Sequence, residues 1–324
     1  METKKVDITV VICTRNRASQ LASVLNSACK LVIPSDLSWE FIVVDNGSSD
    51  GTADVVARYA DRLPIRCVRE DTPGLSNARN RGVQEAKGNY ICWTDDDVVI
   101  DPEWLSAYVA AFKRHPEAAV FGGRIIPHLE SPTPNWFEKA KYDWPLNSLL
   151  AYRNLGDEVI ALSFKNNKVP YGANFAIRTA EQKRTRYNPE LGVSPIHKRV
   201  GEETDVIYRI FKEGGNGWWV PSSKVTHIIP TKRQTLKYLF EYAYLGGGTF
   251  AYLRDKFPND NYLLATGVPP FGYYFDKFSL YWRIAHRAIE YILATILRRK
   301  SRFSILREVG FYAGVISYKK LNND

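Results

Sequence analysis

Cysteine is scarce in this 324-residue sequence. The four cysteines are Cys13, Cys29, Cys67 and Cys92, and their spacing matches no metal-binding motif. Cys13 and Cys92 fall in stretches that we predict to be buried strands. Free thiols at such places are typical of a reducing compartment, so we expect a cytoplasmic protein.

Long hydrophobic runs are also missing. No stretch reaches the roughly 18 charge-free apolar residues that a membrane span needs. The opening residues METKKVDITVVICT contain an acid at once and lead into a strand-like run, so we expect no signal peptide. With 45% apolar and 24% charged residues, the composition is that of a globular protein with a substantial core.

The first 230 residues have almost no excess charge. The net charge is +9, and residues 231–324 hold 15 lysines and arginines against 7 acids, so this segment alone carries +8. Such asymmetry indicates contact with a polyanion, either a membrane surface or a nucleic acid. We therefore predict two parts, residues 1–230 and a basic extension of residues 231–324.

Strand-like and helix-like segments alternate in the first hundred residues. Apolar runs typical of buried strands cover residues 6–13, 41–44, 65–70 and 90–93. Helical spacing covers residues 18–31, 52–59 and 74–86. This alternation predicts βαβ units, an α/β fold and a mainly parallel sheet. Ligands of such sheets bind at the carboxyl ends of the strands.

Three acids, Asp95, Asp96 and Asp97, directly follow the fourth of these strands. Their mutual repulsion in a low-dielectric setting would need a cation to offset it. Clusters of oxygen ligands suit Mg²⁺ or Mn²⁺, which in turn suit phosphate ligands. The alternative is a solvated acidic turn that caps a helix beginning near Pro102.

Other polar residues follow the first two strands and would lie at the same edge of the sheet. They are Thr14, Arg15, Arg17 and Asp45. Together with the three acids, they match a nucleoside diphosphate better than a bare metal site. Alternatively, Asp45 forms an Asx-turn or a helix cap, and the two arginines are solvated surface residues.

Glu202 and Glu203 open a predicted helix that ends at the glycine pair 214–215. We expect Glu203 to extend the apolar stripe of this helix toward the cleft, and Glu202 to lie on a different face. A carboxylate at this place would be ionised at pH 7 and able to take a proton from a hydroxyl. Alternatively, both glutamates merely favour the helix dipole.

Two further stretches allow a ligand contact. An aromatic segment would form either a sugar-stacking wall or a core under a loop, and it contains Trp136, Trp144 and Tyr152. A strand predicted over residues 169–177 places the small Gly172 and Ala173 beside Asn174, and small residues let the backbone approach a ligand. The alternative is a plain strand with a bulge.

The basic extension is predicted to be helical. The glycines at 246–248 should break its first helix. Over residues 281–297, one face is apolar and is made of Tyr281, Ile284, Ala285, Ala288, Ile289, Ile292 and Ile296. Basic residues accompany it, as expected for an amphipathic helix on an anionic membrane surface. The alternative is a helix packed on the protein or on a second subunit.

Five segments, in this order, resemble the family 2 glycosyltransferases: VVICTRNR, FIVVDNGSSDGT, GLSNARNRGVQEAKGNYICWTDDDV, YGANFAIRT and GEETDVIYRIFKEGGNGWWVPSSKVTHIIP. The resemblance covers about residues 6–230. It implies a GT-A fold and inverting transfer of a sugar from a nucleotide-diphosphate sugar to an acceptor hydroxyl, with Mn²⁺ or Mg²⁺ as cofactor. It also implies a role in bacterial-type polysaccharide or glycolipid assembly.

The resemblance implies a donor site. Thr14 and Arg15 would line the nucleotide pocket, with Arg17 beside them. Asp45 would accept a hydrogen bond from the base, which favours UDP because uracil has an N3–H, although guanine and thymine have one too. The remaining donor contacts would be Arg79 near the phosphates, Asp95 at the ribose and sugar, and Asp96.

The resemblance also implies the metal, base and acceptor contacts. Asp97 would bind the metal, and His227 would complete the metal site or contact the diphosphate, although a lone histidine is more often structural. Glu203 would be the base where the family has an aspartate, with Glu202 as the substitute. The strand with Gly172, Ala173 and Asn174 would lie beside the donor sugar and the acceptor.

Other functions remain to be weighed. The change from aspartate to Glu203 would also fit a catalytically impaired, membrane-associated protein that still binds nucleotide sugars. A nucleotidyltransferase would need a glycine-rich loop after the first strand, and CTRNR is not one. We expect no nucleic acid partner, because the positive charge lies outside the motifs. We favour an enzyme on the inner face of the plasma membrane, acting on a sugar or lipid-linked acceptor.

Overall fold

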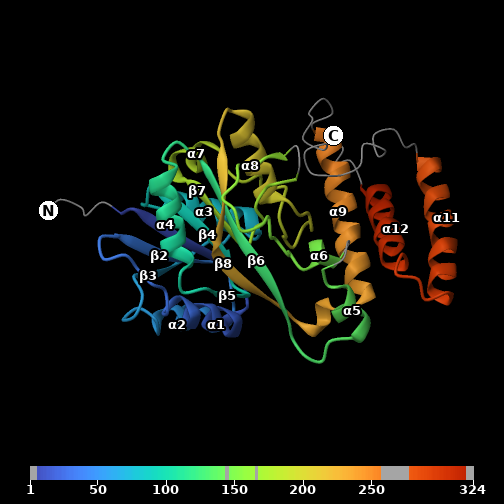
Figure 1. The fold of residues 1–324 in the computed structure, drawn as a ribbon, viewed down its shortest axis with the longest axis horizontal. Coiled ribbons are helices and arrows are strands. Elements are labelled where there is room, and N and C mark those ends of the chain that lie inside the picture. The colour runs from blue at the N-terminus through green and yellow to red at the C-terminus, as the bar shows by residue number, and fades with distance from the viewer. Residues whose placement is uncertain (1–5, 143–145, 165–166, 257–276, 319–324) are drawn as a thin grey trace.

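A mixed eight-stranded sheet forms the centre of the computed structural model, which describes residues 6–142, 146–164, 167–256 and 277–318 (Figure 1). The strand order is β3-β2-β1-β4-β7-β6-β8-β5. The strands are β1 (Ile8–Thr14), β2 (Trp39–Asp45), β3 (Ile65–Arg69), β4 (Tyr90–Asp95), β5 (Val98–Ile100), β6 (Val120–Leu129), β7 (Asn174–Arg178) and β8 (Gly217–Ile229).

Helices cover both faces of this sheet. Along β1, Val10 and Ile12 belong to one hydrophobic cluster and Val11 to another, as the period of a strand requires. The first cluster includes residues of α1 (Ala18–Ala28), α2 (Thr52–Ala57) and α4 (Trp104–Arg114), and the second includes residues of α3 (Leu75–Glu85) and α8 (Glu202–Lys212). The predicted α/β fold is confirmed.

The predicted parallel half of the sheet is confirmed as well. β1 pairs in parallel with β2 and with β4, and β2 pairs in parallel with β3. This register sets Thr14 opposite Asp45 and Cys13 opposite Asp95. The polar groups that follow these strands therefore lie along one edge.

The strand predicted over residues 169–177 is shorter than expected. β7 begins only at Asn174 and runs antiparallel to β4 and β6. Gly172 and Ala173 lie in the turn that precedes it. Two short helices lie near this part of the chain, α6 (Leu146–Leu149) before the turn and α7 (Thr179–Arg184) after β7.

The break expected at Gly246, Gly247 and Gly248 is wrong. α9 (Leu236–Lys256) runs through all three glycines and packs against α12 (Arg302–Ser317), as Figure 1 shows. A Cβ atom on Gly247 would overlap the carbonyl oxygen of Phe311, and one on Gly314 would overlap that of Tyr244. The glycines therefore let the two helices approach backbone to backbone.

A third long helix, α11 (Lys277–Ile296), packs on the side of α12 away from α9 (Figure 1). The helices α9 and α12 join the rest of the molecule through a hydrophobic cluster that contains Phe137 of α5 (Asn135–Ala140), Leu239 and Phe303. The Trp136 ring stacks on Phe303 with centroids 5.0 Å apart. Trp136 thus belongs to a core under a loop.

The structure describes only one of the other two aromatic residues of that segment, and it packs against another ring. The ring of Tyr152 packs against Tyr142, and Trp144 lies outside the described residues.

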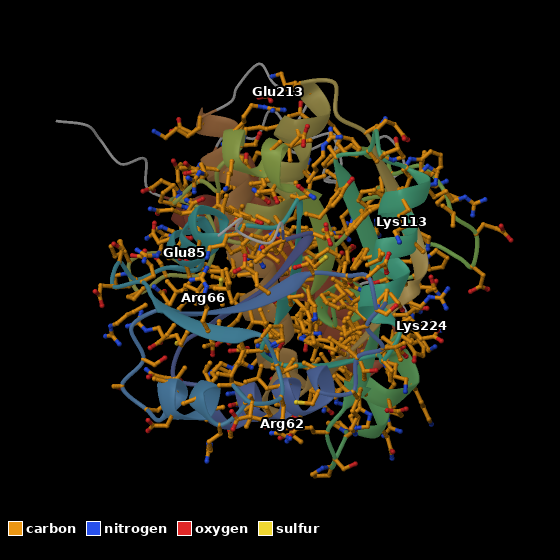
Figure 2. All side chains as sticks on the ribbon, turned by 90° about the vertical axis from the view of Figure 1, so that its left-hand side faces the viewer. Arg62, Arg66, Glu85, Lys113, Glu213 and Lys224 are labelled. Carbon is orange, nitrogen blue, oxygen red and sulfur yellow. The ribbon has the colours of Figure 1, made fainter. Side chains whose placement is uncertain are left out.

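Charged side chains lie around the molecule in Figure 2, where Arg66 and Glu85 are neighbours. These two side chains form an ion pair at 2.8 Å.

Candidate active site

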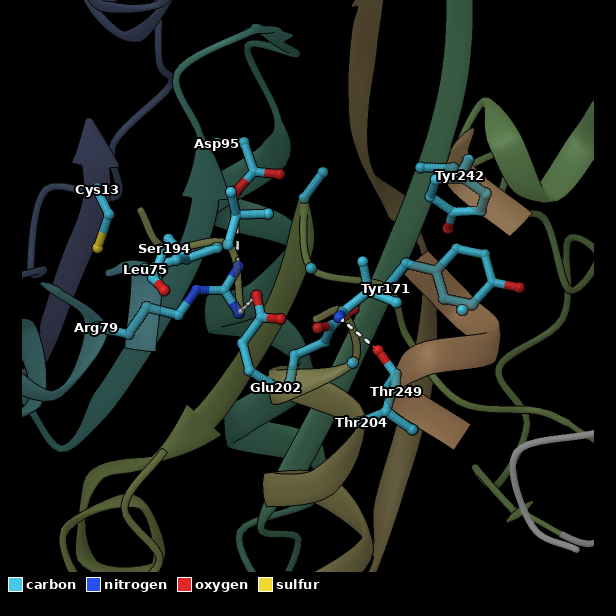
Figure 3. Close-up of a pocket in the computed structure, with 18 of the residues that line it drawn as sticks. Cys13, Leu75, Arg79, Asp95, Tyr171, Ser194, Glu202, Thr204, Tyr242 and Thr249 are labelled. Atoms are coloured by element: carbon cyan, nitrogen blue, oxygen red, sulfur yellow. Dashed lines mark hydrogen bonds and ion pairs between the residues drawn. The ribbon is translucent and has the colours of Figure 1, made fainter. Parts of the chain in front are cut away.

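A cavity of about 910 Å³ opens at the carboxyl ends of β1 and β4 (Figure 3). Cys13, Arg79 and Asp95 line one side of it, and Tyr171 and Tyr242 line the opposite side. Between the two sides lies the start of α8, which contributes Glu202 and Glu203. The cavity thus brings together segments from the start, the middle and the end of the chain.

Two of the three acids at the end of β4, Asp96 and Asp97, form a buried network of charges, while the side chain of Asp95 is 38% exposed. Arg17 binds Asp96 through Nη1 at 2.6 Å and Asp97 through Nη2 at 3.0 Å. The hydroxyl of Thr14 donates a hydrogen bond to Asp96 at 2.7 Å. Asp96 is only 4% exposed and Asp97 only 9%, so the alternative of a solvated acidic turn is wrong.

Asp97 has the largest number of cationic partners among these acids. The Nε2 atom of His227 and an Nη atom of Arg233 each lie 3.4 Å from its carboxylate, in addition to Arg17. Burial acts to raise the pKa of Asp97, but the bond from His227 and the surrounding positive charges outweigh it, so the pKa is lowered. Burial raises the pKa of Asp96 to about 7, and the charge of Arg17 offsets only part of this rise.

The donor atoms at this turn fit a divalent cation. Carboxylate oxygens and an imidazole are ligands that Mn²⁺ and Mg²⁺ accept. The pKa of Asp96 is raised chiefly by burial, and a cation bound beside it would offset this effect. The described residues nevertheless contain no preassembled group of three or more metal ligands. In the structure, Arg17, Arg233 and His227 each contact the carboxylate of Asp97.

Arg79 links the acids of β4 to the start of α8. Its guanidinium is buried over the rings of Trp93, Phe175 and Tyr187. It lies 3.3 Å from Glu202 and 3.7 Å from Asp95. The resemblance implies a place for Arg79 near the phosphates, and in the structure its guanidinium lies beside these two carboxylates at the cavity.

The two glutamates that open α8 lie on other faces of the helix than predicted. Glu202 was expected to lie away from the apolar stripe, but it is buried. It precedes the buried Val206 by four residues, about one helical turn, and so lies on the same face. Burial and the charge of Glu203 raise the pKa of Glu202 to about 7. Glu203 is half-buried and also lines the cavity. Both predicted base residues therefore lie in the site.

Gly172 is the close neighbour of this charged group. A Cβ atom at Gly172 would lie 3.1 Å from Nη2 of Arg79 and 3.4 Å from the carboxylate of Glu203. A larger residue would push on both side chains. Gly172 and Ala173 line the cavity, as expected from their size.

Two predicted site residues do not reach the cavity. Asp45 accepts a hydrogen bond from the Ser48 amide at 2.8 Å, as in the alternative of an Asx-type turn, and the neighbouring Asn46 lines the cavity instead. Asn174 is fully buried, and its amide oxygen accepts hydrogen bonds from Trp104 and Tyr108. Its side chain therefore serves the core and not a ligand.

Other lining residues were missed at the sequence level. They are Asn46, Tyr171, Arg233, Tyr238, Tyr242 and Arg307. Arg233 lies four residues beyond the end of β8, so its place after that strand could have indicated it. Tyr238, Tyr242 and Arg307 come from helices whose packing no local pattern predicts.

Comparison with known proteins adds a family and a fold. The profile of the family described as Glycosyl transferase family 2 matches residues 9–178, just over half of the chain. Hyaluronan synthase from Pasteurella multocida is 31% identical over 125 residues, which are 38% of this chain and only 13% of that protein. The succinoglycan biosynthesis protein ExoM of Rhizobium meliloti is 23% identical over 253 residues, covering 77% of this chain and 75% of that one.

A solved structure shares the whole architecture. A mannosyltransferase from Pyrobaculum calidifontis, in complex with GDP-Man and Mn²⁺, superposes with a TM-score of 0.59 at 17% identity. The superposition covers 97% of this chain and 87% of the other. At this identity the likeness concerns the fold, and it confirms the predicted GT-A arrangement.

Proposed function

Because the chain belongs to glycosyl transferase family 2, we propose that it transfers a sugar from a nucleotide-diphosphate sugar to an acceptor hydroxyl, with inversion at the anomeric carbon. One observation carries the proposal: the acids that follow β4 and the two glutamates that open α8 line one cavity. The roles named for hyaluronan synthase and ExoM support a place in polysaccharide or glycolipid assembly.

The donor would bind at the edge where β1, β2 and β4 end. Thr14, Arg15 and Arg17 line this part of the cavity. Arg17 and Arg233 supply guanidinium groups, which suit phosphate oxygens. Asp45 lies outside the cavity, one residue before Asn46, which lines it, so the proposed contact of Asp45 to the base extends the donor site beyond the cavity. This contact favours UDP, although the mannosyltransferase neighbour holds GDP-Man.

A divalent cation, Mn²⁺ or Mg²⁺, is part of the proposal. Asp97 and His227 would hold it, with Asp95 and Asp96 beside them at the ribose, sugar and phosphates. When bound, such an ion neutralises the charge that develops on a departing diphosphate. Arg17 and Arg233 contact the same carboxylate and supply further positive charge there.

Glu203 is the proposed base that takes the proton of the acceptor hydroxyl. Glu202 is tied to Arg79 at 3.3 Å in the buried wall, whereas Glu203 is more exposed and faces the turn at Gly172. Glu202 remains the substitute. Attack from the side of Glu203, opposite the diphosphate, would invert the anomeric carbon.

The C-terminal helices are proposed to place the enzyme on the inner face of the plasma membrane. Within the described residues, no helix is long and apolar enough to cross a membrane. The outward face of α11 is nonetheless apolar, and it carries Tyr281, Trp282, Ile289, Ile292, Leu293 and Ile296. Arg298, Arg299 and Lys300 follow directly. We propose residues 1–230 as the nucleotide-sugar-binding and catalytic part and residues 231–324 as an extension that faces the membrane and also lines the cavity, through Arg233, Tyr242 and Arg307.

Thermal stabilisation by nucleotide sugars tests the donor site. The wild type, Asp97→Ala and the control Asp36→Ala, an exposed acid outside the cavity, would each be melted with UDP-, GDP- and dTDP-sugars, with and without Mn²⁺. We expect one nucleotide family to stabilise the wild type and the control in the presence of Mn²⁺, by about 2.7 kcal/mol at a hundredfold excess over Kd. Asp97→Ala should lose this effect.

The same ligand then tests catalysis. We expect Glu203→Gln to bind the donor as the wild type does and to lose transfer, including transfer to water, by a factor of at least about 100. If the wild type binds the donor but shows no turnover with any acceptor or with water, the impaired binding protein is the better function. If no nucleotide stabilises the wild type, the donor site is wrong.

A further inference from the structure

The wall of the cavity opposite the three acids is built by the C-terminal helices. α9 contributes Tyr238 and Tyr242, and α12 contributes Arg307. Tyr171 completes this wall from the turn before β7, and Figure 3 shows it with Tyr242 across the cavity from Cys13 and Asp95. The wall thus combines three phenol rings with one guanidinium group.

Tyr242 connects this wall to the proposed base. The charges of both Glu203 and Arg307 act on Tyr242, together with its neighbours Tyr171 and Tyr238. A molecule whose hydroxyl reaches Glu203 would therefore lie beside these rings, in the cavity that Arg307 also lines. Aromatic faces are suitable platforms for the apolar faces of sugar rings.

Arg307 is a cation in a place where burial disfavours its charge. Burial lowers its pKa, and Tyr242 and Glu308 are among the groups that counter this effect. Burial raises the pKa of Tyr242, so this phenol is neutral at pH 7. Glu308 also binds Arg287 at 2.9 Å. Because Arg307 also lines the cavity, it is placed to meet an anionic group of a bound molecule.

We propose that Tyr171, Tyr238, Tyr242 and Arg307 form an acceptor subsite for a saccharide that carries an anionic group, a carboxylate or a phosphate. The inference rests on the proposed function, because Glu203 fixes the place of the acceptor hydroxyl. The planar guanidinium binds either oxyanion through paired hydrogen bonds. Arg17 and Arg233 both contact Asp97 and are assigned to the donor diphosphate, and Arg233 also lies over the Tyr238 ring, 5.9 Å from its centroid. Arg307 is the guanidinium that we assign to a second anion.

Three probes with the same tail and sugar ring test this subsite without a known acceptor. They are octyl glucoside, octyl glucuronide and the octyl diester of glucose 1-phosphate, used below their micelle concentrations. Their Kd values would be measured by calorimetry for the wild type. We expect at least one anionic probe to bind about tenfold more tightly than the neutral one. The tighter of the two anionic probes identifies the anion as carboxylate or phosphate.

Three variants separate recognition from general attraction. Arg307→Gln should bind the anionic probe about tenfold more weakly and the neutral probe unchanged. Arg307→Lys should keep part of the preference. Arg299→Gln is the matched control, because Arg299 is exposed, lies outside the cavity and has the same charge. Its affinities should equal those of the wild type.

Equal affinity of all three probes for the wild type would overturn the inference. This comparison uses the wild type alone, so it does not depend on whether a variant folds. An equal loss in Arg299→Gln would also overturn it, because net charge would then explain the binding. Nucleotide stabilisation with Mn²⁺ is measured on the same samples. If it is intact while the probes show no charge preference, only the acceptor subsite fails. If it is absent in the wild type, the proposed function fails.

Discussion

Glu202 is a buried acid whose protonation is linked to folding. Its pKa rises from 4.5 to about 7 in the folded protein, first because of burial and then because of the charge of Glu203. Because the folded protein binds this proton more tightly than the unfolded chain, protonation of Glu202 stabilises the fold. This contribution is fully present below about pH 4.5 and is lost as the pH rises through about 7. The contribution is on the order of 3 kcal/mol.

We therefore expect Glu202→Gln to gain stability relative to the wild type as the pH increases from about 5 to about 8. Urea unfolding across this range measures the difference at each pH. Glu213→Gln is the control, since Glu213 is an exposed acid at the other end of α8. A constant difference between Glu202→Gln and the wild type would show that Glu202 does not titrate in this window.

Residues that sit at the ends of parallel strands could be predicted from the sequence. Thr14, Asp45 and Asp95 were placed at one edge because the strand rule depends only on chain order and strand direction. The fate of each side chain could not be predicted in the same way. Asn174 is used by Trp104 and Tyr108, and both belong to α4, which no local pattern connects to β7.

At the scale of elements, the contact of α9 with α12 depends on glycines. A Cβ at Gly314 would overlap the Tyr244 carbonyl of α9, whereas a Cβ at Gly246 would meet no atom within 4 Å. We expect Gly314→Ala to destabilise the protein by about 1–3 kcal/mol, because the helices must move apart. Gly246→Ala should stabilise it by up to about 1 kcal/mol, because alanine favours the helix.

Urea unfolding of both variants measures the two effects in one helix pair. The opposite signs are the important part of this prediction. If the variants changed stability equally, glycine content and not the helix contact would explain the result. Because α9 and α12 line the cavity, Gly314→Ala should also weaken the binding of the anionic saccharide probe.

This helix pair also shows why part of the architecture was missed. The strands β1 to β4 and the helices between them have clear apolar periodicity, so their order along the chain predicts the parallel part of the sheet. The short β5, which pairs antiparallel with β8, was not predicted. Three glycines in a row predict a break when only α9 is considered. The helix continues because α12 brings its own glycines, Gly310 and Gly314, about 60 residues later in the chain.

At the scale of the molecule, positive charge and exposed apolar side chains occur together at one end. α11 and the chain that follows it belong to the segment that carries +8 of the net charge. The structure changes the predicted apolar face in detail: Ile284 and Ala288 are half-buried, while Trp282 and Leu293 point outward. An outward face of this kind fits an anionic interface, where basic residues add about 1 kcal/mol each.

We expect the protein to float with vesicles of phosphatidylcholine containing about a third phosphatidylglycerol, and not with phosphatidylcholine alone. Ile289 and Ile292 are 61% and 57% exposed, so the double variant Ile289→Asp, Ile292→Asp should fold normally and bind these vesicles at least about tenfold more weakly. Ile196→Asp is the control, because Ile196 is 92% exposed but lies outside the helix. Light scattering of the same proteins checks the alternative that this face of α11 joins two copies of the chain. That alternative holds if the wild type is a dimer, the double variant is a monomer, and neither protein binds vesicles.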